Sequence, residues 1–305
     1  MTGGSGLTGP EVESQVTAFL HRWGMVPEGA VRDRLLRTGI GGSVARCFPA
    51  ADGDGKRLIA ETFTWFTAFD DLHESGPVAP DTAAVVARLV GALDRDDRDP
   101  PGHRGDRHDA TVAAFTAVTA ELRRRLAPAQ FTRLADAVRG YFLAVLWEGS
   151  ARDVRADDYL TMRRHLSFAR MLPPLLEWST GRVLPADLHE APAARRLLTR
   201  FCDVVLLFND LVSFSWEHAH RGRAGDLSNL IAITARDAGC PAEEATATVR
   251  TLLEAALDDH RALRATVLDG APQAAAYLKA LDDFLAGLLS HGLPGRYGTG
   301  PGPGT

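Results

Sequence analysis

Apolar residues recur at helical spacing along almost the whole chain, and no other feature of the sequence restricts the possible folds as strongly. From Pro10 to His291 they follow the i, i+3, i+4, i+7 pattern, and alanine, leucine and arginine fill many other positions. Alternating apolar and polar runs bounded by tight turns, which are typical of strands, do not occur in the sequence. The pattern therefore predicts an all-α protein of about ten helices. The clearest helical segments are Ala113–Leu126, Gln130–Trp147, Ala193–His218, Ala242–Leu268 and Ala271–Leu289.

Glycine, proline and polar residues mark the expected helix ends. These breaks are Gly76-Pro77, Asp94–Asp109, Pro128, Pro173-Pro174, Gly239–Pro241 and Gly270–Pro272. No long Pro/Gly/Ser linker and no repeat of fixed period divides the chain, so we expect residues 10–297 to form one domain. The glycine-rich ends, residues 1–9 and 298–305, are expected to be disordered. The charged run 94–109 is expected to be a solvated surface loop.

The composition argues against several classes of protein. Of the 305 residues, 45% are hydrophobic and 24% are charged, the balance of a soluble globular chain. No apolar run approaches the ~18 residues of a membrane span, and a net charge of −5 without a basic stripe argues against nucleic acid as the main partner. Cys47, Cys202 and Cys240 are far apart, so neither a disulfide framework nor a zinc site is expected. The first residues lack the basic start and apolar segment of a secretory signal, so we expect a cytoplasmic protein.

Carboxylates end one of the apolar segments. In FDDLHE, Asp70 and Glu74 are four residues apart and share a helical face, with Asp71 beside Asp70. Two carboxylates on one face repel each other unless a cation lies between them, and their oxygens suit hard ions such as Mg²⁺. A solvated helix end is the alternative interpretation, because Gly76-Pro77 follow at once.

A second polar stripe lies inside another apolar segment. Asn209, Ser213 and Glu217 are spaced i, i+4, i+8, so an amide, a hydroxyl and a carboxylate share one helical face. Each offers one oxygen ligand, and together they make half of an octahedral Mg²⁺ site with room for water and phosphate. An exposed polar face is the alternative, but apolar residues such as Phe208 and Val212 interleave too densely for this helix to be largely exposed.

Together with Arg163 and the pair Arg296-Tyr297, these two motifs make the chain resemble a class I terpene synthase (terpene cyclase) of the bacterial type. The four elements stand in the family's order and spacing, with Arg163 46 residues before Asn209, and the resemblance covers nearly the whole chain. It implies an all-α, single-domain class I terpenoid synthase fold, a helical bundle around a central active-site cavity. It also implies Mg²⁺ as the cofactor, with three ions.

The resemblance assigns roles to individual residues. The residues of the two metal-binding motifs are Asp70, Asp71, Glu74, Asn209, Ser213 and Glu217. Arg163 matches the arginine that senses the diphosphate in this family. Arg296 and Tyr297 match the pair that closes over the diphosphate as the active site shuts. The segment GDLSNL at 225–230 also looks like the family's continuation after the triad.

The chain departs from the family's pattern at three places. The aspartate-rich motif ends in Glu74, which still supplies a carboxylate. Trp216 stands where many relatives keep a basic residue that reaches the diphosphate, so one phosphate contact is expected to be missing. Leu166 and Ser167 stand where some relatives use an acidic residue and a glycine. This last departure concerns how ionisation is triggered and leaves the reaction class unchanged.

Aromatic residues near the motifs are candidates for a cavity wall. A carbocation requires a dry cavity, and aromatic faces can stabilise it. For each residue taken singly, packing in the core is the alternative. The candidates are Phe63, Phe66, Phe69, Trp147, Phe168 and Phe208.

Two histidines lie next to motif carboxylates, but we expect a plain polar role for both. Imidazole favours softer ions than Mg²⁺. His218 follows Glu217 directly, so a helix turns it about 100° away from the polar stripe. His73 is an i+3 step from Asp70 and is the better candidate of the two.

The resemblance implies ionisation and cyclisation of an allylic prenyl diphosphate to a terpene hydrocarbon or alcohol, with release of diphosphate. Farnesyl diphosphate is the expected substrate, and relatives often pair as homodimers. The alternatives are a diterpene synthase acting on geranylgeranyl or a pre-cyclised C20 diphosphate, and a non-catalytic helical binding protein. A prenyl-elongating transferase is disfavoured, because such enzymes carry a second DDxxD-like motif and this chain has only two lysines, Lys56 and Lys279.

Overall fold

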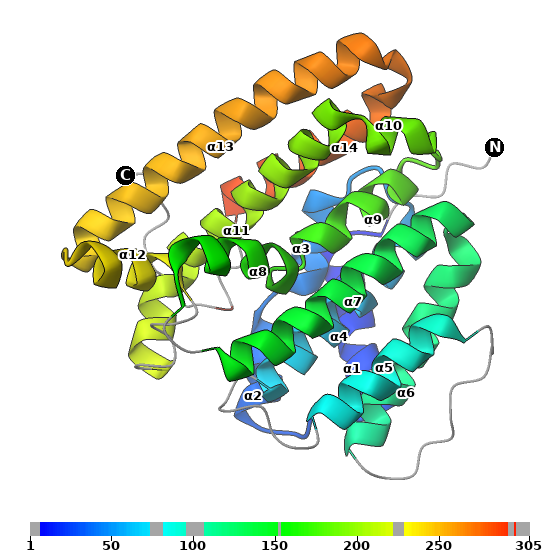
Figure 1. Cartoon of the computed structure of the whole chain (residues 1–305). Helices are drawn as coiled ribbons and strands as arrows, with labels where there is room; N and C mark the ends of the chain where they lie inside the picture. Colours follow the sequence, from blue (N-terminus) through cyan, green and yellow to red (C-terminus); the bar gives the residue numbers. More distant parts are fainter. Residues whose placement is uncertain are drawn as a thin grey trace.

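The structure is a computed structural model that describes residues 7–73, 82–95, 107–151, 154–221, 229–291 and 296. All regular secondary structure in these residues is helical, which confirms the all-α prediction (Figure 1). The first half contains α1 (Gly9–Trp23), α2 (Ala30–Arg37), α3 (Ile40–Cys47), α4 (Gly53–His73), α5 (Thr82–Asp94), α6 (Arg107–Arg125) and α7 (Pro128–Ser150). The second half contains α8 (Ala156–Leu166), η1 (Ala169–Met171), α9 (Leu172–Ser179), α10 (Ala186–Glu190), α11 (Pro192–Arg221), α12 (Leu230–Ala238), α13 (Ala242–Gly270), η3 (Pro272–Ala274) and α14 (Ala275–His291).

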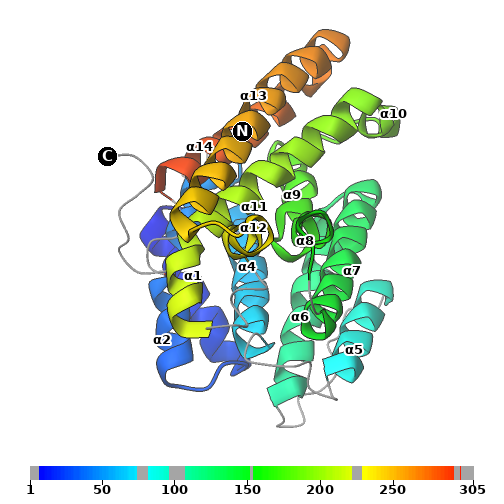
Figure 2. The same cartoon turned by 60° about the vertical axis from the view of Figure 1, so that its left-hand side comes forward.

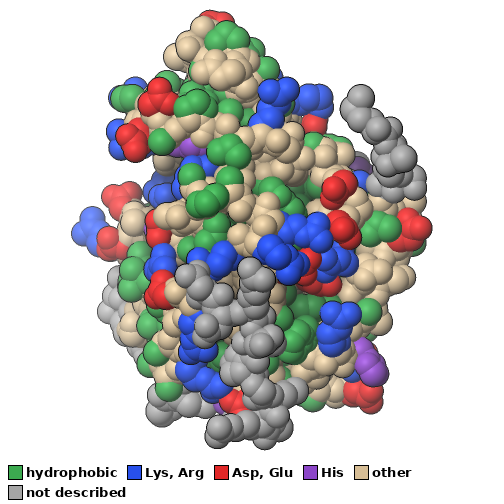
Figure 3. Space-filling view, turned by 90° about the vertical axis from the view of Figure 1, so that its right-hand side faces the viewer, with side chains coloured by type: hydrophobic (Ala, Val, Ile, Leu, Met, Phe, Trp, Pro, Cys, Tyr) green, Lys and Arg blue, Asp and Glu red, His purple; other side chains and the backbone are tan. Residues whose placement is uncertain are grey.

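The helices form one bundle in which α4 and α11 carry the two polar stripes. α4 packs against α1, α3 and α6, whereas α11 packs against α13, α12 and α14. In two views of the bundle, α13 and α14 lie at the opposite end of the molecule from α5 and α6 (Figure 1, Figure 2). Acidic and basic side chains intermingle over the face drawn in Figure 3. No helix in the described ranges is long and apolar enough to cross a lipid bilayer.

An aromatic cluster fixes the position of α4 in the core. The Trp65 ring stacks on Phe69 with ring centroids 5.0 Å apart and lies 4.6 Å from Phe115 of α6. Its indole N–H donates to the carbonyl of Thr111 at 2.9 Å, so the buried polar atom is paired. This cluster positions the rest of α4, including the carboxylates near its C-terminal end.

The long helices lie where the sequence predicts them, but the short ones were undercounted. The five segments with the clearest periodicity correspond to α6, α7, α11, α13 and the η3–α14 segment. The described part of the chain contains fourteen α-helices rather than about ten. Helices such as α2, with 8 residues, and α10, with 5, span too few turns to show a repeating pattern.

Two predicted boundaries are wrong for local reasons. Pro173 and Pro174 do not break the chain but lie in the first turn of α9, where a missing N–H costs no helical hydrogen bond. At the N-terminus, the predicted disordered segment 1–9 is too long. Thr8 and Glu11 form a capping box that starts α1 at Gly9. Residues 298–305 and most of the run 94–109 lie outside the described residues.

A glycine seats α3 against α1, and α3 in turn forms part of the cavity wall described below. The Gly41 N–H donates to the Glu13 carboxylate at 2.8 Å. A Cβ atom at position 41 would lie only 2.3 Å from the backbone nitrogen of Glu13. Because this neighbour is backbone rather than a flexible side chain, the two helices can approach so closely only with glycine at this position.

We expect Gly41→Ala to lower the free energy of unfolding by about 1–3 kcal/mol, because the new methyl group pushes α3 away from α1. Gly91→Ala in α5 is the matched control, since the added Cβ meets only the Arg95 side chain at 3.8 Å. This control should be neutral or stabilising by about 0.5 kcal/mol. Urea unfolding followed by circular dichroism measures both, and equal effects of the two substitutions would contradict the close-approach argument.

Candidate active site

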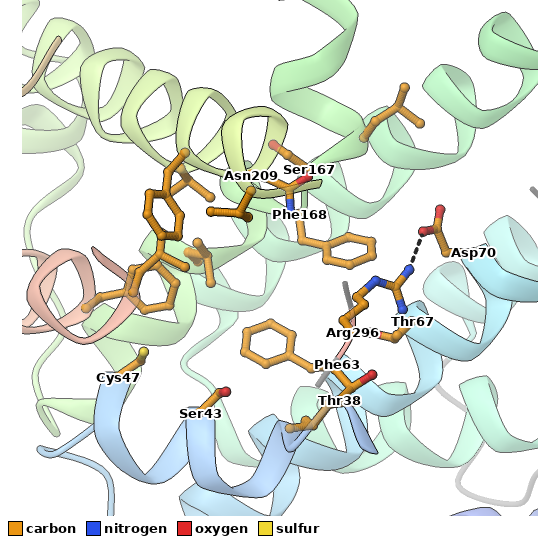
Figure 4. A pocket seen from close by; sticks show the side chains of 18 of the residues that line it. Thr38, Ser43, Cys47, Phe63, Thr67, Asp70, Ser167, Phe168, Asn209 and Arg296 are labelled. Carbon is orange, nitrogen blue, oxygen red and sulfur yellow. Dashed lines mark hydrogen bonds and ion pairs between the residues drawn. The ribbon is translucent and has the colours of Figure 1, made fainter. Parts of the chain in front are cut away.

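A cavity of about 170 Å³ lies between α3, α4, α8, α11 and α14. Most of its wall is apolar. In the close view, Cys47 lies at the opposite side of the cavity from Asp70 and Arg296 (Figure 4). The charged and amide side chains that line the cavity are Asp70, Glu148, Arg163, Asn209, Glu217 and Arg296. Five of these six residues were predicted as site residues from the sequence, and Glu148 was not.

Asp70 and Arg296 face each other at the cavity edge. The Arg296 Nη2 donates to the Asp70 Oδ2 at 3.2 Å, as the dashed line in Figure 4 marks. The Asp70 side chain is 23% exposed. Glu74 and Tyr297, the other expected members of these two motifs, lie outside the described residues.

Asp71 has a different environment from the one expected of a metal ligand. Its side chain is fully buried and does not line the cavity. Instead its Oδ1 pairs with the Arg34 Nη2 at 2.6 Å and the Arg296 Nη2 at 3.0 Å. The helix turns consecutive residues by about 100°, so Asp70 and Asp71 cannot share one face of α4. In this structure Asp71 is therefore a buried ion-pairing residue, and its role as a metal ligand stays a prediction.

The second stripe runs along α11 as its spacing predicts. Asn209 and Glu217 line the cavity, and Ser213 lies fully buried between them. The Asn209 Oδ1 accepts a hydrogen bond from the Arg163 Nη2 at 2.7 Å. The stripe is thus linked directly to the arginine that the resemblance singled out.

Asn229 holds the other end of this stripe. Its Nδ2 donates to the Glu217 Oε2 at 3.0 Å and to the Ser213 Oγ at 3.4 Å. Its Oδ1 accepts from the Ile231 N–H at 2.9 Å and so caps α12. No role is predicted for Asn229 from the sequence, although an asparagine directly before an apolar run is a recognisable N-cap signal.

Asp210 is a second residue that the sequence analysis missed. Its carboxylate is fully buried and accepts hydrogen bonds from the Tyr159 hydroxyl at 2.8 Å and the Arg163 Nε at 3.0 Å. The backbone N–H of Leu230 also donates to it, at 3.0 Å. Nothing in the sequence distinguishes this aspartate from the many surface carboxylates, because its partners come from distant helices.

The network around Asp210 determines which groups are charged. Burial raises the pKa of Tyr159 well above its ordinary value, so the phenol keeps the proton that it donates to Asp210. Burial by itself lowers the pKa of Arg163, but the surrounding groups, including Asp210 and Glu217, outweigh it and hold that pKa above the usual range. Arg163 therefore presents a permanent cation to the cavity.

Aromatic rings form part of the apolar wall. Phe63, Phe168 and Phe208 line the cavity, and so do Phe48 and Phe284, which the sequence analysis did not identify. Figure 4 shows the rings of Phe63 and Phe168 projecting into the cavity from different elements. Phe168 has a left-handed backbone with φ of 60°, which is unfavourable for a residue with a side chain.

Three of the expected wall residues do not line the cavity. Phe63 and Asp70 share one face of α4, whereas Phe66 and Phe69 are rotated from Phe63 by about 60° and 120°. These two rings therefore pack into the aromatic core, where both lie close to Phe142. The prediction is wrong for these two residues and for Trp147, which is half-buried outside the cavity lining.

Two further side chains bear on reactivity at the site. Burial raises the pKa of the Cys47 thiol to about 11, so this wall residue stays protonated and is a weak nucleophile. His218 is exposed on α11, stacks on Phe214 and does not line the cavity, which fits a plain polar role. The side chain of His73 lies outside the described part of the chain.

The donor atoms fit a hard cation. Within the described ranges, no three His, Cys, Asp or Glu side chains converge as a metal site. A metal here would therefore use amide and hydroxyl oxygens together with carboxylates, which are the atoms of Asn209, Ser213, Glu217 and Asp70. An all-oxygen set of this kind suits Mg²⁺ rather than a softer metal.

Comparisons with known proteins agree with this geometry. The family described as terpene synthase family 2, C-terminal metal binding, matches residues 61–259. The chain is 31% identical to labda-7,13(16),14-triene synthase of Streptomyces clavuligerus, over 86% of this chain and 77% of that protein. It is 25% identical to 4-epi-cubebol synthase ((2E,6E)-farnesyl diphosphate cyclizing) of Streptosporangium roseum, over 93% and 85%.

A solved structure shows the shared fold. The 2-methylisoborneol synthase from Streptomyces coelicolor A3(2), in complex with Mg²⁺ and 2-fluoroneryl diphosphate, aligns with a TM-score of 0.81. The alignment covers 98% of this chain and 99% of that chain at 19% identity. At this identity the likeness supports the fold alone.

We expect Asp210→Asn to lower the free energy of unfolding by about 3–5 kcal/mol, because it leaves the buried Arg163 cation without its charge partner. Asp283→Asn is the control: its partner Lys279 is 70% exposed, so the loss should stay below about 1 kcal/mol. Urea denaturation of both variants tests this difference. A loss at Asp210 no larger than at Asp283 would show that the buried network contributes little.

Proposed function

The chain belongs to terpene synthase family 2, and from this membership we propose that it ionises an allylic prenyl diphosphate with the help of Mg²⁺ and cyclises the resulting cation. The observation that carries the proposal is the pairing of two chemistries in one cavity. Asp70, Asn209 and Glu217 supply hard oxygen donors, and the remaining wall is mostly apolar and aromatic.

The family that matches residues 61–259 is described as metal binding, and we propose that the metal is Mg²⁺. Asp70 on α4 and the stripe of Asn209, Ser213 and Glu217 on α11 would hold the ions, with Glu74 as a further carboxylate. We propose three Mg²⁺ ions. When bound, they neutralise charge on the diphosphate and so make it a better leaving group.

Two arginines would bind the diphosphate beside the metal ligands. Arg163 is held against Asn209, and Arg296 against Asp70, so each guanidinium lies next to a proposed ligand. The bond between C1 and the diphosphate oxygen breaks, and its electron pair leaves with the diphosphate. Fixed cations at this position stabilise the negative charge that develops on the leaving group. We propose that Tyr297 joins Arg296 in covering the diphosphate.

The apolar wall would control the fate of the carbocation. Phe63 and Phe168 present ring faces that can stabilise positive charge, and Cys47 stays a neutral thiol. The cation closes onto a double bond of the same chain. Loss of a proton to diphosphate or water then gives a hydrocarbon, whereas addition of water followed by loss of a proton from the added oxygen gives an alcohol.

Farnesyl diphosphate is the proposed substrate, and a twenty-carbon diphosphate is the second candidate. The name of the related 4-epi-cubebol synthase specifies cyclisation of farnesyl diphosphate. The more similar relative is named for a labdatriene, which favours a C20 substrate, including a pre-cyclised one. We also propose a homodimer, which light scattering of the purified protein measures directly.

The first test is to incubate the protein with geranyl, farnesyl, geranylgeranyl and pre-cyclised labdadienyl diphosphates, with Mg²⁺ and with a chelator. One of these substrates should give a cyclic terpene and pyrophosphate, and the chelator should abolish both. Product from farnesyl diphosphate supports the first candidate, and product from a C20 diphosphate alone supports the second. The absence of pyrophosphate from all four would contradict the proposed reaction.

Asp70→Ala and Asn209→Ala should each lower turnover by about 10²-fold or more while helical content is retained, because each removes a proposed metal ligand. Product analysis and circular dichroism measure the two quantities. Ser290→Ala at the end of α14, outside the cavity lining, is a control that should leave turnover unchanged. Normal turnover in either site variant would remove that residue from the proposed metal site.

Arg296→Lys should slow release of diphosphate by about tenfold, since lysine keeps the charge but cannot reproduce the planar fork of donors. Single-turnover measurement of pyrophosphate tests this step directly. An unchanged rate would mean that Arg296 does not contact the leaving group.

A further inference from the structure

Arg34 lies outside every motif that the sequence analysis identified, yet it touches both metal-binding helices. It belongs to the short helix α2, and its side chain is 22% exposed. Two contacts hold its guanidinium, one to Asp71 on α4 and one to Trp216 on α11. A single side chain thereby connects the two polar stripes.

The contact with Asp71 is shared with a second arginine. The Asp71 Oδ1 lies 2.6 Å from the Arg34 Nη2 and 3.0 Å from the Arg296 Nη2. Because the Asp71 side chain is fully buried, its charge must be compensated within the protein. The shorter of the two contacts is to Arg34, so Arg34 is the nearer compensating charge. The Arg296 Nη2 alone contacts both Asp71 and Asp70.

The contact with Trp216 fixes the position of the Arg34 guanidinium. The guanidinium carbon lies 4.9 Å from the centroid of the Trp216 ring, which is the geometry of a cation–π interaction. Trp216 directly precedes Glu217, so the ring is fixed to the helix that carries the stripe. The side chain at position 216 is thus not basic itself, but it has the Arg34 cation of another helix stacked on its ring.

We propose that Arg34 is a positioning residue for diphosphate binding, an inference that rests on the proposed function. By compensating the buried charge of Asp71 it leaves Arg296 able to exchange its carboxylate contacts for the diphosphate. In a protein without Arg34, Arg296 is the one of these two arginines that is left to compensate the Asp71 charge. This ion pair then keeps Arg296 away from the substrate. Trp216 keeps the Arg34 guanidinium in place during this exchange.

The test uses inorganic pyrophosphate with Mg²⁺ as the probe and isothermal titration calorimetry as the readout. Arg34→Met should weaken pyrophosphate binding about tenfold, and Arg34→Lys should restore part of it. Trp216→Phe, which keeps an aromatic face, should bind better than Trp216→Leu. Arg139→Met is the matched control, because Arg139 also connects two helices through ion pairs, with Asp94 of α5 and Asp136 of α7, and neither of these helices carries a polar stripe.

Two results would overturn the proposal. In the first, Arg34→Met lowers the melting temperature of the free protein but leaves the pyrophosphate affinity unchanged, which indicates a purely structural role. The second concerns the double variant Arg34→Met/Arg296→Met. If Arg34 acts through Arg296, the double variant binds pyrophosphate as weakly as Arg296→Met alone. A further, additive loss would mean that Arg34 acts independently of Arg296.

The outcome separates this inference from the proposed function. If the wild-type protein binds pyrophosphate with Mg²⁺ in the Arg34-dependent way but converts no prenyl diphosphate, the proposed reaction fails and the role of Arg34 stands. If the wild-type protein turns over substrate and Arg34→Met binds pyrophosphate normally, the role of Arg34 fails alone. The KM of the active variants gives a second readout, since loss of positioning should raise KM for the diphosphate substrate.

Discussion

The rest of the site depends on the hydrogen bonds and the ion pair that compensate the buried carboxylate of Asp210. A charge removed from water is stable only when its oxygens are paired, and here Tyr159 and Arg163 of α8 and the N–H of Leu230 supply the partners. Three helices therefore meet at one side chain. Since Arg163 also donates to Asn209, the requirement to compensate Asp210 fixes a permanent cation beside the polar stripe of α11.

Cations already occupy both polar edges of the cavity in the free protein. Arg296 pairs with Asp70, and Arg163 with Asn209, so groups proposed to bind metal and diphosphate hold one another. Substrate binding is then an exchange of partners rather than a simple addition of charges. An exchange of this kind avoids leaving buried polar atoms unpaired in the free state, which would cost about 1–3 kcal/mol for each group. It also links affinity for the substrate to the strength of the contacts that are given up.

Helical periodicity carries a large share of the information about this fold, but it does not specify which face of a helix meets the cavity. On α11 the polar residues Asn209, Ser213 and Glu217 mark that face by themselves. α4 is buried on nearly every side from residue 58 to residue 69, so burial of apolar residues does not separate Phe63, which lines the cavity, from Phe66, which packs in the core. Only the seven-residue spacing between Phe63 and Asp70 marks the cavity face of this helix.

Pairings between distant segments are the second kind of information that the sequence lacks. The sequence predicts Asp71 as part of a metal-binding motif, whereas in the structure its carboxylate pairs with Arg34. Nothing in the local sequence of α2 indicates that contact. Asn229 is an intermediate case, because its N-cap position is visible in the sequence whereas its bonds to Ser213 and Glu217 are not. Local signals are thus predictable, and side-chain partners across helices are not.

The ring of Phe168 separates the cavity from the aromatic core. It lines the cavity on one side and lies 5.5 Å from the Phe66 ring and 5.3 Å from the Tyr141 ring on the other. Its left-handed backbone directs the ring into this partition and would favour glycine over any larger residue if conformation alone decided. Shortening this one side chain would extend the hollow toward the core without moving a helix. Substitutions at position 168 would therefore change the volume and shape of the cavity, and with them the size of the molecules that fit inside it.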